Sequence, residues 1–372
     1  MKFVIITHVE HILEDKLYYA YAPYVREMNV WLNYVDEVVL VAPLESKKRA
    51  AIHSCYGHKN IRFKSIPKMN LLSFKSIFMS ILNTPSVSWS IFKAMRDADH
   101  IHLRCPGNIG LLGCIIQVLF PKKPKTAKYA GNWDPKSAQP FTYKLQRWIL
   151  SNTFLTKNMQ VLVYGEWENT SKNIKPFFTA TYREQDKVII SPSLLDSRIH
   201  FLFVGTLSSG KRPIYAVHIV EKLSQLGYPV SLQFFGEGAE RSALQHYCDE
   251  NQLNSIVEFK GNQIESVVRE AYKKSHFLLL PSESEGWPKV VAEAMFWGCL
   301  PIATQVSCVG NMLGYGKRGL LLNMDLESDV DMIRAILKNQ TEYDSKVQES
   351  ILWSRKYTLD LFENEIRALL YL

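Results

Sequence analysis

Short apolar runs rich in β-branched residues alternate with longer segments of helical periodicity along the first half of the chain. The runs predict strands at residues 2–7, 38–41, 61–66, 100–103, 126–130 and 160–163. Strands that alternate with helices in this way are typical of a parallel sheet whose strands are joined by crossover helices. The first half is therefore predicted to be a doubly wound α/β domain.

The same alternation starts again after residues 188–199, a stretch in which serine and proline interrupt the apolar pattern. A boundary there predicts two domains, residues 1–190 and 191–355, and a C-terminal helix at residues 356–372 that packs back toward the first domain. Because open α/β sheets bind ligands beyond the carboxyl ends of their strands, a site is expected in a cleft between the two sheets. The second domain is predicted to have strands at residues 200–204, 230–235, 256–259, 277–280 and 301–303, with helices at residues 213–226, 239–251, 264–274 and 289–297.

The length of 372 residues and the composition, 47% hydrophobic and 22% charged, fit a folded two-domain protein and exclude a disordered or fibrous chain. Charge is distributed unevenly, with 26 Lys+Arg against 14 Asp+Glu in residues 1–190 and 18 against 22 in residues 191–372. The basic first half predicts an acidic partner, nucleic acid or an anionic membrane surface, with a solvated surface as the alternative. No zinc-finger, homeodomain or RNA-recognition pattern accompanies this charge, so nucleic acid is not the expected partner.

The longest uncharged apolar stretch, residues 107–121, is shorter than the roughly 18–20 residues of a membrane-spanning helix. Its residues 107–120 are expected to form a buried helix rather than a membrane anchor. Residues 1–7 are soon followed by His8 and Glu10, so the apolar core of a signal peptide cannot develop. Six cysteines without C-x-x-C spacing predict free thiols and argue against a metal ribbon or a redox dithiol. These features favour a cytoplasmic protein.

Candidate chemistry concentrates in residues 281–304, which read PSESEGWPKVVAEAMFWGCLPIAT. An apolar strand leads into Ser, Glu and Gly and then into a helix, whose first turn exposes backbone amides that bind anions. Glu285 and Glu293 are eight residues apart, so a loop carboxylate and a helix carboxylate are expected to converge on one ligand. The alternative is that Glu285 caps the helix and that Glu293 is a solvated helix position.

Two further glycine turns follow predicted strands. Residues 201–213 (FLFVGTLSSGKRP) bring Lys211 and Arg212 to the start of a helix, where two cations suit a diphosphate. Residues 234–240 (FFGEGAE) form a turn at which a flat ligand can approach the backbone closely. Each turn alone is also an ordinary connection. A G-x-G-x-x-G after the first strand and a G-x-x-x-x-G-K-[ST] are both missing, which disfavours a dehydrogenase and P-loop chemistry.

The order of VGTLSSGK, FFGEGAERSAL, EFKGNQ and PSESEGWPKVVAEAMFWGCLPIAT resembles the donor-binding half of the family 4 retaining glycosyltransferases of GT-B fold. The resemblance covers about residues 200–325, and Glu285 and Glu293 match the E-x7-E motif of that family. It implies an α/β fold with two Rossmann-like, doubly wound domains facing a central cleft. It also implies that the second domain holds most of a nucleotide sugar, that the first domain is on the acceptor side, and that transfer retains configuration without a metal.

The resemblance also implies roles for individual residues. Glu293 is expected to bind the ribose hydroxyls, and Glu285 to contact the donor sugar and stabilise developing positive charge. Lys211 and the backbone amides around Lys289 and Val290 are expected to hold the diphosphate, because preorganised cations and amides stabilise the charge on the leaving group. The same turns contribute further donor-binding candidates: Gly205, Thr206, Arg212, Gly236, Glu237, Gly286, Trp287 and Pro288.

The chain departs from the family pattern at three places. Thr206 stands where the family commonly has Arg, so Arg212 can replace that cation only by turning inward. The first domain lacks the usual glycine pair after its first strand. Residues 129–135 (YAGNWDP) stand where many members place a histidine. Asn132 and Asp134 are candidate catalytic residues there, on the acceptor side, and an Asx turn before the proline is the alternative.

Two side-chain clusters in the first domain receive structural interpretations. His8, Glu10 and His11 lack the spacing of helical metal ligands and an evident third strong ligand, so no metal is expected there. An aromatic cluster is expected to lie in the core rather than to form a platform for a sugar; it comprises Trp133, Phe141, Tyr143 and Trp148.

Together these features predict a cytoplasmic glycosyltransferase that needs no cofactor and uses a nucleotide sugar, a UDP- or GDP-sugar, as donor. The expected acceptor is a glycan or a lipid-linked glycan in bacterial-type polysaccharide or glycolipid assembly, reached by peripheral contact with an anionic membrane at the inner face of the plasma membrane. The alternative is a non-catalytic GT-B subunit that binds a nucleotide sugar and supports a partner enzyme.

Overall fold

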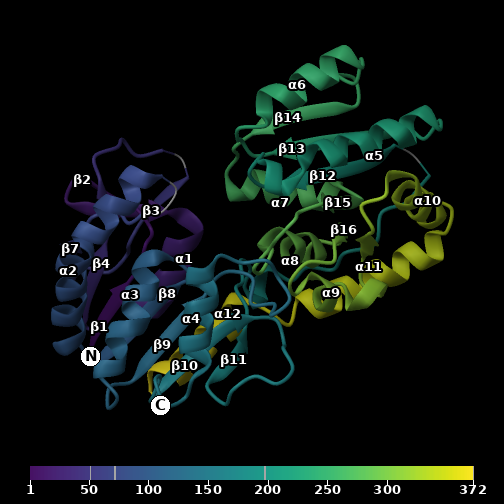
Figure 1. Cartoon of the computed structure of the whole chain (residues 1–372). Helices are drawn as coiled ribbons and strands as arrows, with labels where there is room; N and C mark the ends of the chain where they lie inside the picture. The colour runs from purple at the N-terminus through teal and green to yellow at the C-terminus, as the bar shows by residue number, and fades with distance from the viewer. Residues whose placement is uncertain (51, 71–72, 197, 372) are drawn as a thin grey trace. The chain divides into compact units, whose positions relative to one another are not determined.

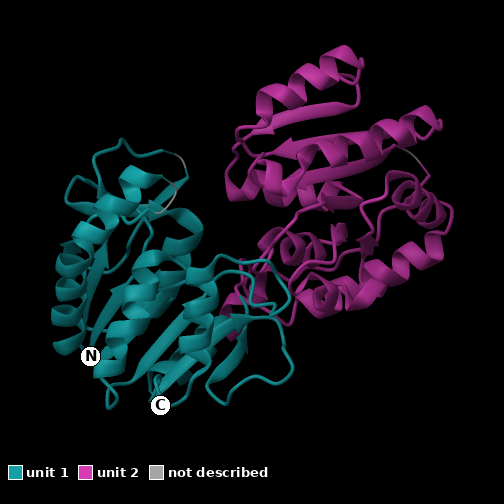
Figure 2. Ribbon diagram, viewed as in Figure 1, with its two compact units in different colours: residues 1–178, 362–372 teal, residues 179–361 magenta. Residues whose placement is uncertain are grey.

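The computed structural model describes residues 1–50, 52–70, 73–196 and 198–371. The chain forms two compact units (Figure 2). Unit 1 comprises residues 1–178 and 362–372, and unit 2 comprises residues 179–361. The chain therefore passes from one unit to the other twice, after Phe178 and after Leu361.

Unit 1 is built on a seven-stranded parallel sheet with the strand order β11-β10-β9-β8-β1-β4-β7 (Figure 1). The order runs outward in both directions from β1, which is the arrangement of a doubly wound sheet. Six of its strands were predicted from their apolar runs, and the edge strand β11 was not. The strands are β1 (Lys2–Ile6), β4 (Glu37–Ala42), β7 (Ile61–Ser65), β8 (His100–Cys105), β9 (Lys125–Tyr129), β10 (Met159–Tyr164) and β11 (Ile174–Phe177).

Helices cover both faces of this sheet. On one face α2 (Phe74–Arg96), α3 (Asn108–Ile116) and α4 (Phe141–Ser151) contribute buried side chains to a single hydrophobic cluster. On the other face Trp31 of α1 (Ala22–Leu32) stacks on Phe3 of β1, with ring centroids 5.9 Å apart. The last helix, α12 (Leu359–Leu370), places Phe362 against Phe177 and Phe178.

A second, four-stranded sheet in unit 1 was not predicted. Its order is β5-β2-β3-β6, with β2 and β3 forming an antiparallel hairpin. The hairpin turn is made by Asp15 and Lys16, which both have positive φ, 50° and 62°. The strands are short: β2 (His11–Glu14), β3 (Leu17–Tyr21), β5 (Leu44–Glu45) and β6 (His53–Cys55).

Unit 2 contains a six-stranded parallel sheet with the order β14-β13-β12-β15-β16-β17. The five predicted strands are present, and the edge strand β17 is additional. The strands are β12 (Ile199–Val204), β13 (Val230–Phe235), β14 (Val257–Gly261), β15 (Phe277–Leu280), β16 (Leu300–Thr304) and β17 (Leu320–Leu322). The helices are α5 (Pro213–Gln225), α6 (Arg241–Glu250), α7 (Glu265–Lys274), α8 (Lys289–Phe296), α9 (Val309–Met312), α10 (Leu326–Leu337) and α11 (Gln340–Ser354).

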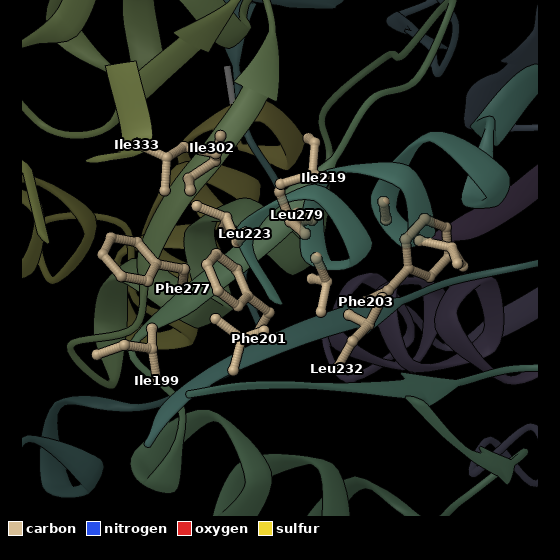
Figure 3. Close-up of a cluster of buried hydrophobic side chains, with 14 of the residues drawn as sticks. Ile199, Phe201, Phe203, Ile219, Leu223, Leu232, Phe277, Leu279, Ile302 and Ile333 are labelled. Carbon is tan, nitrogen blue, oxygen red and sulfur yellow. The ribbon is translucent and has the colours of Figure 1, made fainter. Parts of the chain in front are cut away.

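The core of unit 2 lies between its sheet and the helices α5, α10 and α11. Figure 3 shows side chains of β12 and β15, among them Phe201 and Phe277, pointing into this cluster together with Ile219 and Leu223 of α5. The rings of Phe201 and Phe277 stack with centroids 5.3 Å apart, and each ring is almost completely buried. Burial of such a side chain contributes about 1.5–3 kcal/mol, so this core fixes the strands whose ends carry the candidate site.

The division between the units lies after Phe178, whereas the sequence placed the boundary at residues 190/191. The reason is that the segment after Phe178 packs on helix α8. Tyr182 in this segment places its ring against Phe296 and Trp297, with centroids 4.9 and 5.1 Å away. In the sequence, the loss of strand periodicity placed the boundary at residues 190/191. In the structure, the chain begins to pack on unit 2 earlier, directly after Phe178.

Candidate functional site

The winding direction of the unit 2 sheet reverses between β12 and β15. At such a reversal the crossover helices leave on opposite faces, and a crevice opens outside the carboxyl ends of the two strands. The loops that follow β12 and β15 are joined there by a backbone hydrogen bond from the amide of Glu283 to the carbonyl of Gly210, 2.8 Å long. The candidate donor-binding residues at positions 205–212 and 281–293 therefore lie together at the carboxyl ends of β12 and β15.

Glycines allow the turns after β12 and β13 to pack against each other. Gly205 donates its amide to the carbonyl of Phe235 at 2.9 Å. A Cβ on Gly236, whose φ is +145°, would lie only 1.9 Å from the carbonyl oxygen of Gly205. A Cβ on Gly238 would lie 2.2 Å from the carbonyl oxygen of Leu207. Any side chain at either position would push the two turns apart, so the glycines set the shape of this edge.

Lys211 and Glu285 form an ion pair across the two loops. Lys211 ends a short 3₁₀ turn (Ser209–Lys211), and Glu285 lies in the loop after β15. The side chain of Glu285 is 8% exposed and that of Lys211 is 29% exposed, so the cation faces outward more than the carboxylate does. The structure thus joins two residues that the sequence assigned to the same donor, and Glu285 pairs with a lysine rather than capping a helix.

Arg212 does not join this pair. It has a positive φ of 48° and directs its guanidinium to Glu283, with Nη2 to Oε1 at 3.0 Å. Because the Glu283 side chain is 54% exposed, this ion pair is largely solvated. The inward turn that would let Arg212 replace the family's arginine is not observed, and Thr206 at that arginine's position is exposed.

Helix α8 begins close to this ion pair in sequence. Pro288 occupies the N-cap position, and within the described residues no side chain caps the first turn by a hydrogen bond. The first amides of an α-helix have no partner inside the helix, and the helix dipole adds positive potential at this end. The amides around Lys289 and Val290 are therefore suited to an anion, and their binding of phosphate stays a prediction.

Glu293 lies one turn further along α8 and has different partners. Its carboxylate accepts hydrogen bonds from the hydroxyls of Thr181, at 2.6 Å, and Tyr272, at 3.1 Å. Burial, and then the nearby Glu293 carboxylate, raise the pKa of the Tyr272 hydroxyl, which therefore stays a proton donor. Glu293 is not a solvated helix position, and the contacts of the described residues give it no partner in common with Glu285.

The remaining donor-binding candidates shape the loops. Trp287 packs on α11, with its ring 6.1 Å from that of Trp353 and edge-on to Tyr357 at 5.5 Å. The carbonyl of Gly286 accepts a hydrogen bond from the thiol of Cys308, 3.1 Å away. The carbonyl of Glu237 accepts from the amide of Leu207 at 3.1 Å, which adds to the contact between the first two turns.

In unit 1 the segment after β9 is held as a turn by its own side chains. Asn132 Oδ1 accepts from the amide of Asp134 at 2.9 Å, and Asp134 Oδ1 accepts from the amide of Lys136 at 2.8 Å. Each carboxamide or carboxylate oxygen thus bonds an amide two residues ahead, which is the Asx turn that the sequence left as the alternative. A reaction role for either residue stays a prediction.

The aromatic cluster that was predicted to be core is divided. Trp133 is buried, at 3% exposure, and meets Tyr129 edge-on at 4.8 Å. The prediction was wrong for Phe141 and Trp148, which are 78% and 60% exposed on α4, and Tyr143 is half-buried. Helix α4 buries its other side, through Ile149 and Leu150.

Residues 107–120, predicted to be a buried helix, form α3 and a 3₁₀ turn with a buried and an exposed side. Ile109 and Cys114 are buried, whereas Ile115 and Leu119 are 48% and 65% exposed. All six cysteines are free thiols, as predicted from their spacing.

The three side chains after β1 serve different purposes. His11 is buried and its two ring nitrogens contact the carbonyl of Val9 and the hydroxyl of Tyr56, both at 2.8 Å. Glu10 pairs with Lys68. His8 lies beyond the carboxyl end of β1 and hydrogen-bonds the backbone of Arg104, while desolvation of its imidazole, and then the Arg104 charge, lower its pKa.

His8 was not among the predicted site residues, although the sequence places it directly after the first strand. Its imidazole lies on Gly107, where a Cβ would come within 2.6 Å of Nδ1. The signal available in the sequence was a histidine directly after the first predicted strand, combined with a glycine after the strand that pairs with it.

A known protein family matches the half of the chain that contains Lys211, Glu285 and Glu293. Residues 185–351 match the family model described as Glycosyl transferases group 1. This match places a likeness to the group 1 glycosyltransferases in the second half of the chain. An uncharacterised glycosyltransferase of Methanocaldococcus jannaschii is 26% identical over 140 residues, and this match spans 37% of the present chain and 38% of that relative.

Solved structures show a likeness in fold that extends over the whole chain. HepE of Anabaena, in complex with UDP and glucose, has a TM-score of 0.70 at 12% identity and covers 100% of this chain and 99% of its own. Sucrose-phosphate synthase from Thermosynechococcus elongatus has a TM-score of 0.69 at 15% identity and covers 100% and 98%. Lipopolysaccharide outer core galactosyltransferase WaaB has a TM-score of 0.70 at 16% identity and covers 100% and 99%. The predicted α/β GT-B fold and the resemblance to group 1 glycosyltransferases are confirmed.

Two searches of the described residues bear on the wider predictions for this glycosyltransferase fold. None of the helices described has both the length and the apolar character needed to cross a membrane. In the same residues, His, Cys, Asp and Glu side chains form no group of three or more that could hold a metal ion.

Proposed function

We propose that this protein transfers a sugar from a nucleoside diphosphate sugar to an acceptor hydroxyl, with retention of configuration and without a metal. The observation that carries the proposal is the Lys211–Glu285 ion pair where the sheet of unit 2 changes winding direction, next in sequence to the uncapped start of α8. One cation, one shielded carboxylate and a helix N-terminus are the groups that a diphosphate leaving group and a positively charged sugar require.

The leaving nucleoside diphosphate gains negative charge as the glycosidic bond breaks. Lys211 is the cation proposed to stabilise this charge, and the amides of Lys289 and Val290 would also bind phosphate oxygens. Fixed donors of this kind stabilise a transition state more than water does, because they do not have to reorganise as the charge develops. In the proposed reaction they take the place of a divalent metal.

Glu285 would face the sugar on which positive charge develops. In the structure Glu285 forms an ion pair with Lys211, the cation that is proposed to bind the diphosphate. Arrival of the diphosphate would draw Lys211 toward phosphate and leave the carboxylate of Glu285 to the sugar. The ion pair thus brings together two side chains of opposite charge, each proposed to contact a different part of one ligand.

Glu293 would bind the ribose through the carboxylate that now accepts from Thr181 and Tyr272. Two hydroxyl donors already satisfy this carboxylate, and ribose hydroxyls offer the same chemistry. We therefore expect the ribose to exchange with the Thr181 hydroxyl, which is the more replaceable donor because Tyr272 is fully buried.

The donor is proposed to be a UDP- or GDP-sugar, and the acceptor a glycan or a lipid-linked glycan in polysaccharide or glycolipid assembly at the cytoplasmic side of a membrane. The UDP complexes of HepE support UDP as the first nucleotide to test. Unit 1, with the basic N-terminal half of the chain, is proposed to receive the acceptor; His8, Asn132 and Asp134 are its polar side chains beyond the ends of β1 and β9.

The first experiment measures thermal stabilisation of the purified protein by UDP-, GDP-, ADP- and CDP-sugars, since a ligand of the folded state raises its melting temperature. The Lys211→Met variant should lose the shift that wild type shows with one nucleotide. The matched control is Lys222→Met, because Lys222 forms an ion pair with Glu327 on the surface of the same unit. An equal shift in wild type and Lys211→Met would remove Lys211 from the site.

A second measurement separates an enzyme from a subunit that only binds donor, a reading that the exposed Thr206 at the family's arginine position keeps open. Release of nucleoside diphosphate from the stabilising donor is followed for wild type and Glu285→Gln. Transfer predicts turnover in wild type and a loss of about 10²–10³-fold in the variant. Binding without turnover in wild type would identify the non-catalytic subunit.

A further inference from the structure

Helix α2 has two apolar sides. Its core side carries Val87, Ile91 and Met95, which are completely buried in the unit 1 cluster. At about 100° per residue, Phe74, Phe78 and Trp89 lie within roughly 60° of one another and about 100–160° from the middle of that core side. A surface helix normally presents polar residues there. We call Phe74, Phe78 and Trp89, together with the exposed apolar residues between them, the outer stripe. It does not contribute to the core of unit 1.

The outer stripe is large and open. On α2 the exposed fractions are 93% for Phe74, 62% for Phe78, 63% for Ile81, 57% for Leu82 and 56% for Trp89. Isolated exposed apolar residues are ordinary, but contiguous apolar surface on a helix marks an interaction site.

The neighbouring helices extend this surface. Helix α3 packs beside α2 and α4 packs beside α3, and all three contribute to the same buried cluster (Figure 1). Their outer sides therefore form one layer. Exposed apolar side chains continue across it in Ile115 and Leu119 at the end of α3, Trp148 on α4 and Phe154 just after α4. We call this outer layer the α2–α4 face.

The segments that build the α2–α4 face are rich in basic and poor in acidic residues. Residues 46–165 contain three acidic residues, Asp97, Asp99 and Asp134. Lysines lie among the exposed rings: Lys93 Nζ is 5.0 Å from the centroid of Trp89, and Lys157 Nζ is 5.2 Å from that of Phe154. Apolar and aromatic side chains mixed with lysines, with few acidic residues, are complementary to a bilayer surface, whose headgroups are anionic and whose interior is apolar.

We propose that the α2–α4 face docks on the surface of an anionic phospholipid bilayer, with Phe74, Phe78 and Ile81 entering the headgroup region and the lysines contacting lipid phosphates. The helices lie flat in this arrangement, and no helix of the described residues needs to cross the membrane. The proposal deepens the membrane contact of the proposed function by naming its surface. It does not depend on the transfer reaction, because docking requires neither donor nor Glu285.

The test is co-sedimentation of the full chain with vesicles. Wild type should bind vesicles of phosphatidylglycerol and phosphatidylcholine in equal parts, bind phosphatidylcholine vesicles at least about tenfold more weakly, and dissociate as salt rises to about 0.5 M. The double variant Phe78→Ser with Ile81→Ser should lose at least about tenfold in vesicle affinity, because it removes two exposed apolar side chains.

The matched control is Ile264→Ser with Leu352→Ser. Ile264 and Leu352 are 69% and 62% exposed, like the two test positions, but they lie in unit 2. This control should bind vesicles as wild type does. Because all four side chains are exposed, both double variants should fold, which melting temperatures near that of wild type would verify.

Three results would overturn the proposal: no binding to anionic vesicles, equal binding by wild type and the Phe78/Ile81 variant, or equal binding to both lipid compositions. Light scattering on the lipid-free protein tests whether a second copy of the chain covers this face instead. A wild-type dimer that becomes a monomer in the Phe78/Ile81 variant would assign the face to that second copy. Donor-induced thermal shifts in the same variant separate this proposal from the donor site, because they should equal those of wild type whatever the vesicles show.

Discussion

A single methyl group at Gly236 tests whether the packed turns of unit 2 form the donor site. The Gly236→Ala change places a Cβ 1.9 Å from the carbonyl oxygen of Gly205, and its φ of +145° is one that residues with side chains rarely adopt. Real Cβ contacts are at least 3.0 Å, so the two turns must separate by about 1.1 Å. The turn that moves is the one that leads from β12 to Lys211.

The expected loss of stability has two parts. The unfavourable backbone conformation costs about 1–3 kcal/mol. Forced movement of packed backbone costs a further 1–3 kcal/mol or so. The free energy of unfolding should therefore fall by roughly 2–6 kcal/mol. Displacement of Lys211 by about 1 Å should also lower the rate of donor turnover by about 10²-fold in the fraction that stays folded.

Urea unfolding and nucleoside diphosphate release measure the two effects on the same preparations. Gly227→Ala is the control for backbone strain alone, because Gly227 has a φ of +85° but open space around its Cβ position. It should cost about 1–2 kcal/mol and leave donor turnover unchanged. If Gly236→Ala is no more destabilising than Gly227→Ala, or turns over donor at the wild-type rate, the packing argument is refuted.

Two more predictions concern buried polar groups. Thr181→Val removes a hydrogen bond to a carboxylate and should lower the free energy of unfolding by about 1.5–3 kcal/mol, with Thr181→Ser restoring it, as measured by urea titration; an undiminished stability in Thr181→Val would contradict the contact with Glu293. Burial lowers the pKa values of His11 and His100 to about 4, against about 6.5 in an unfolded chain. Between these values the unfolded state binds more protons, so unfolding of unit 1 should become easier by about 2 kcal/mol per histidine from pH 7 to pH 5. His100→Gln should weaken this pH dependence, and an unchanged dependence in the variant would exclude His100 as its source.

The sheets were predictable because buried parallel strands read as continuous apolar runs. The small sheet was not, because its strands are two to five residues long and mix polar with apolar side chains. Its hairpin turn also lacks the usual Asn-Gly or Asp-Gly signal, since Lys16 takes the second positive-φ position. Strand β11 was missed for a related reason: Pro176 reads as a strand breaker, although an edge strand tolerates it.

The candidate site was predictable only as far as local motifs define it. The glycine turns and the helix start follow from short segments, and the structure places them together. The partners of Glu293 could not be predicted from a short segment. Thr181 is 112 residues away in sequence and reaches the carboxylate only because the residues after β11 pack on α8. No spacing rule in the sequence connects that segment with helix α8.

A second limit of the sequence is that it does not show which side of a helix faces the sheet. The sequence of α4 contains apolar residues on two sides, Phe141 with Trp148 and Ile149 with Leu150, and its pattern does not say which side faces the sheet. The structure buries the second pair and exposes the first, which reversed the core prediction.

The same ambiguity explains why the two halves of the chain differ in what their sequences reveal. The chemistry of unit 2 depends on backbone shape at strand ends, which specific glycines and charges must encode in short motifs. The α2–α4 face of unit 1 depends only on how much apolar and cationic surface points outward, a property that many sequences satisfy and no motif records. The proposed donor site is for this reason indicated by residue order alone, whereas the proposed docking surface is indicated only once the folded core shows which apolar residues stay exposed.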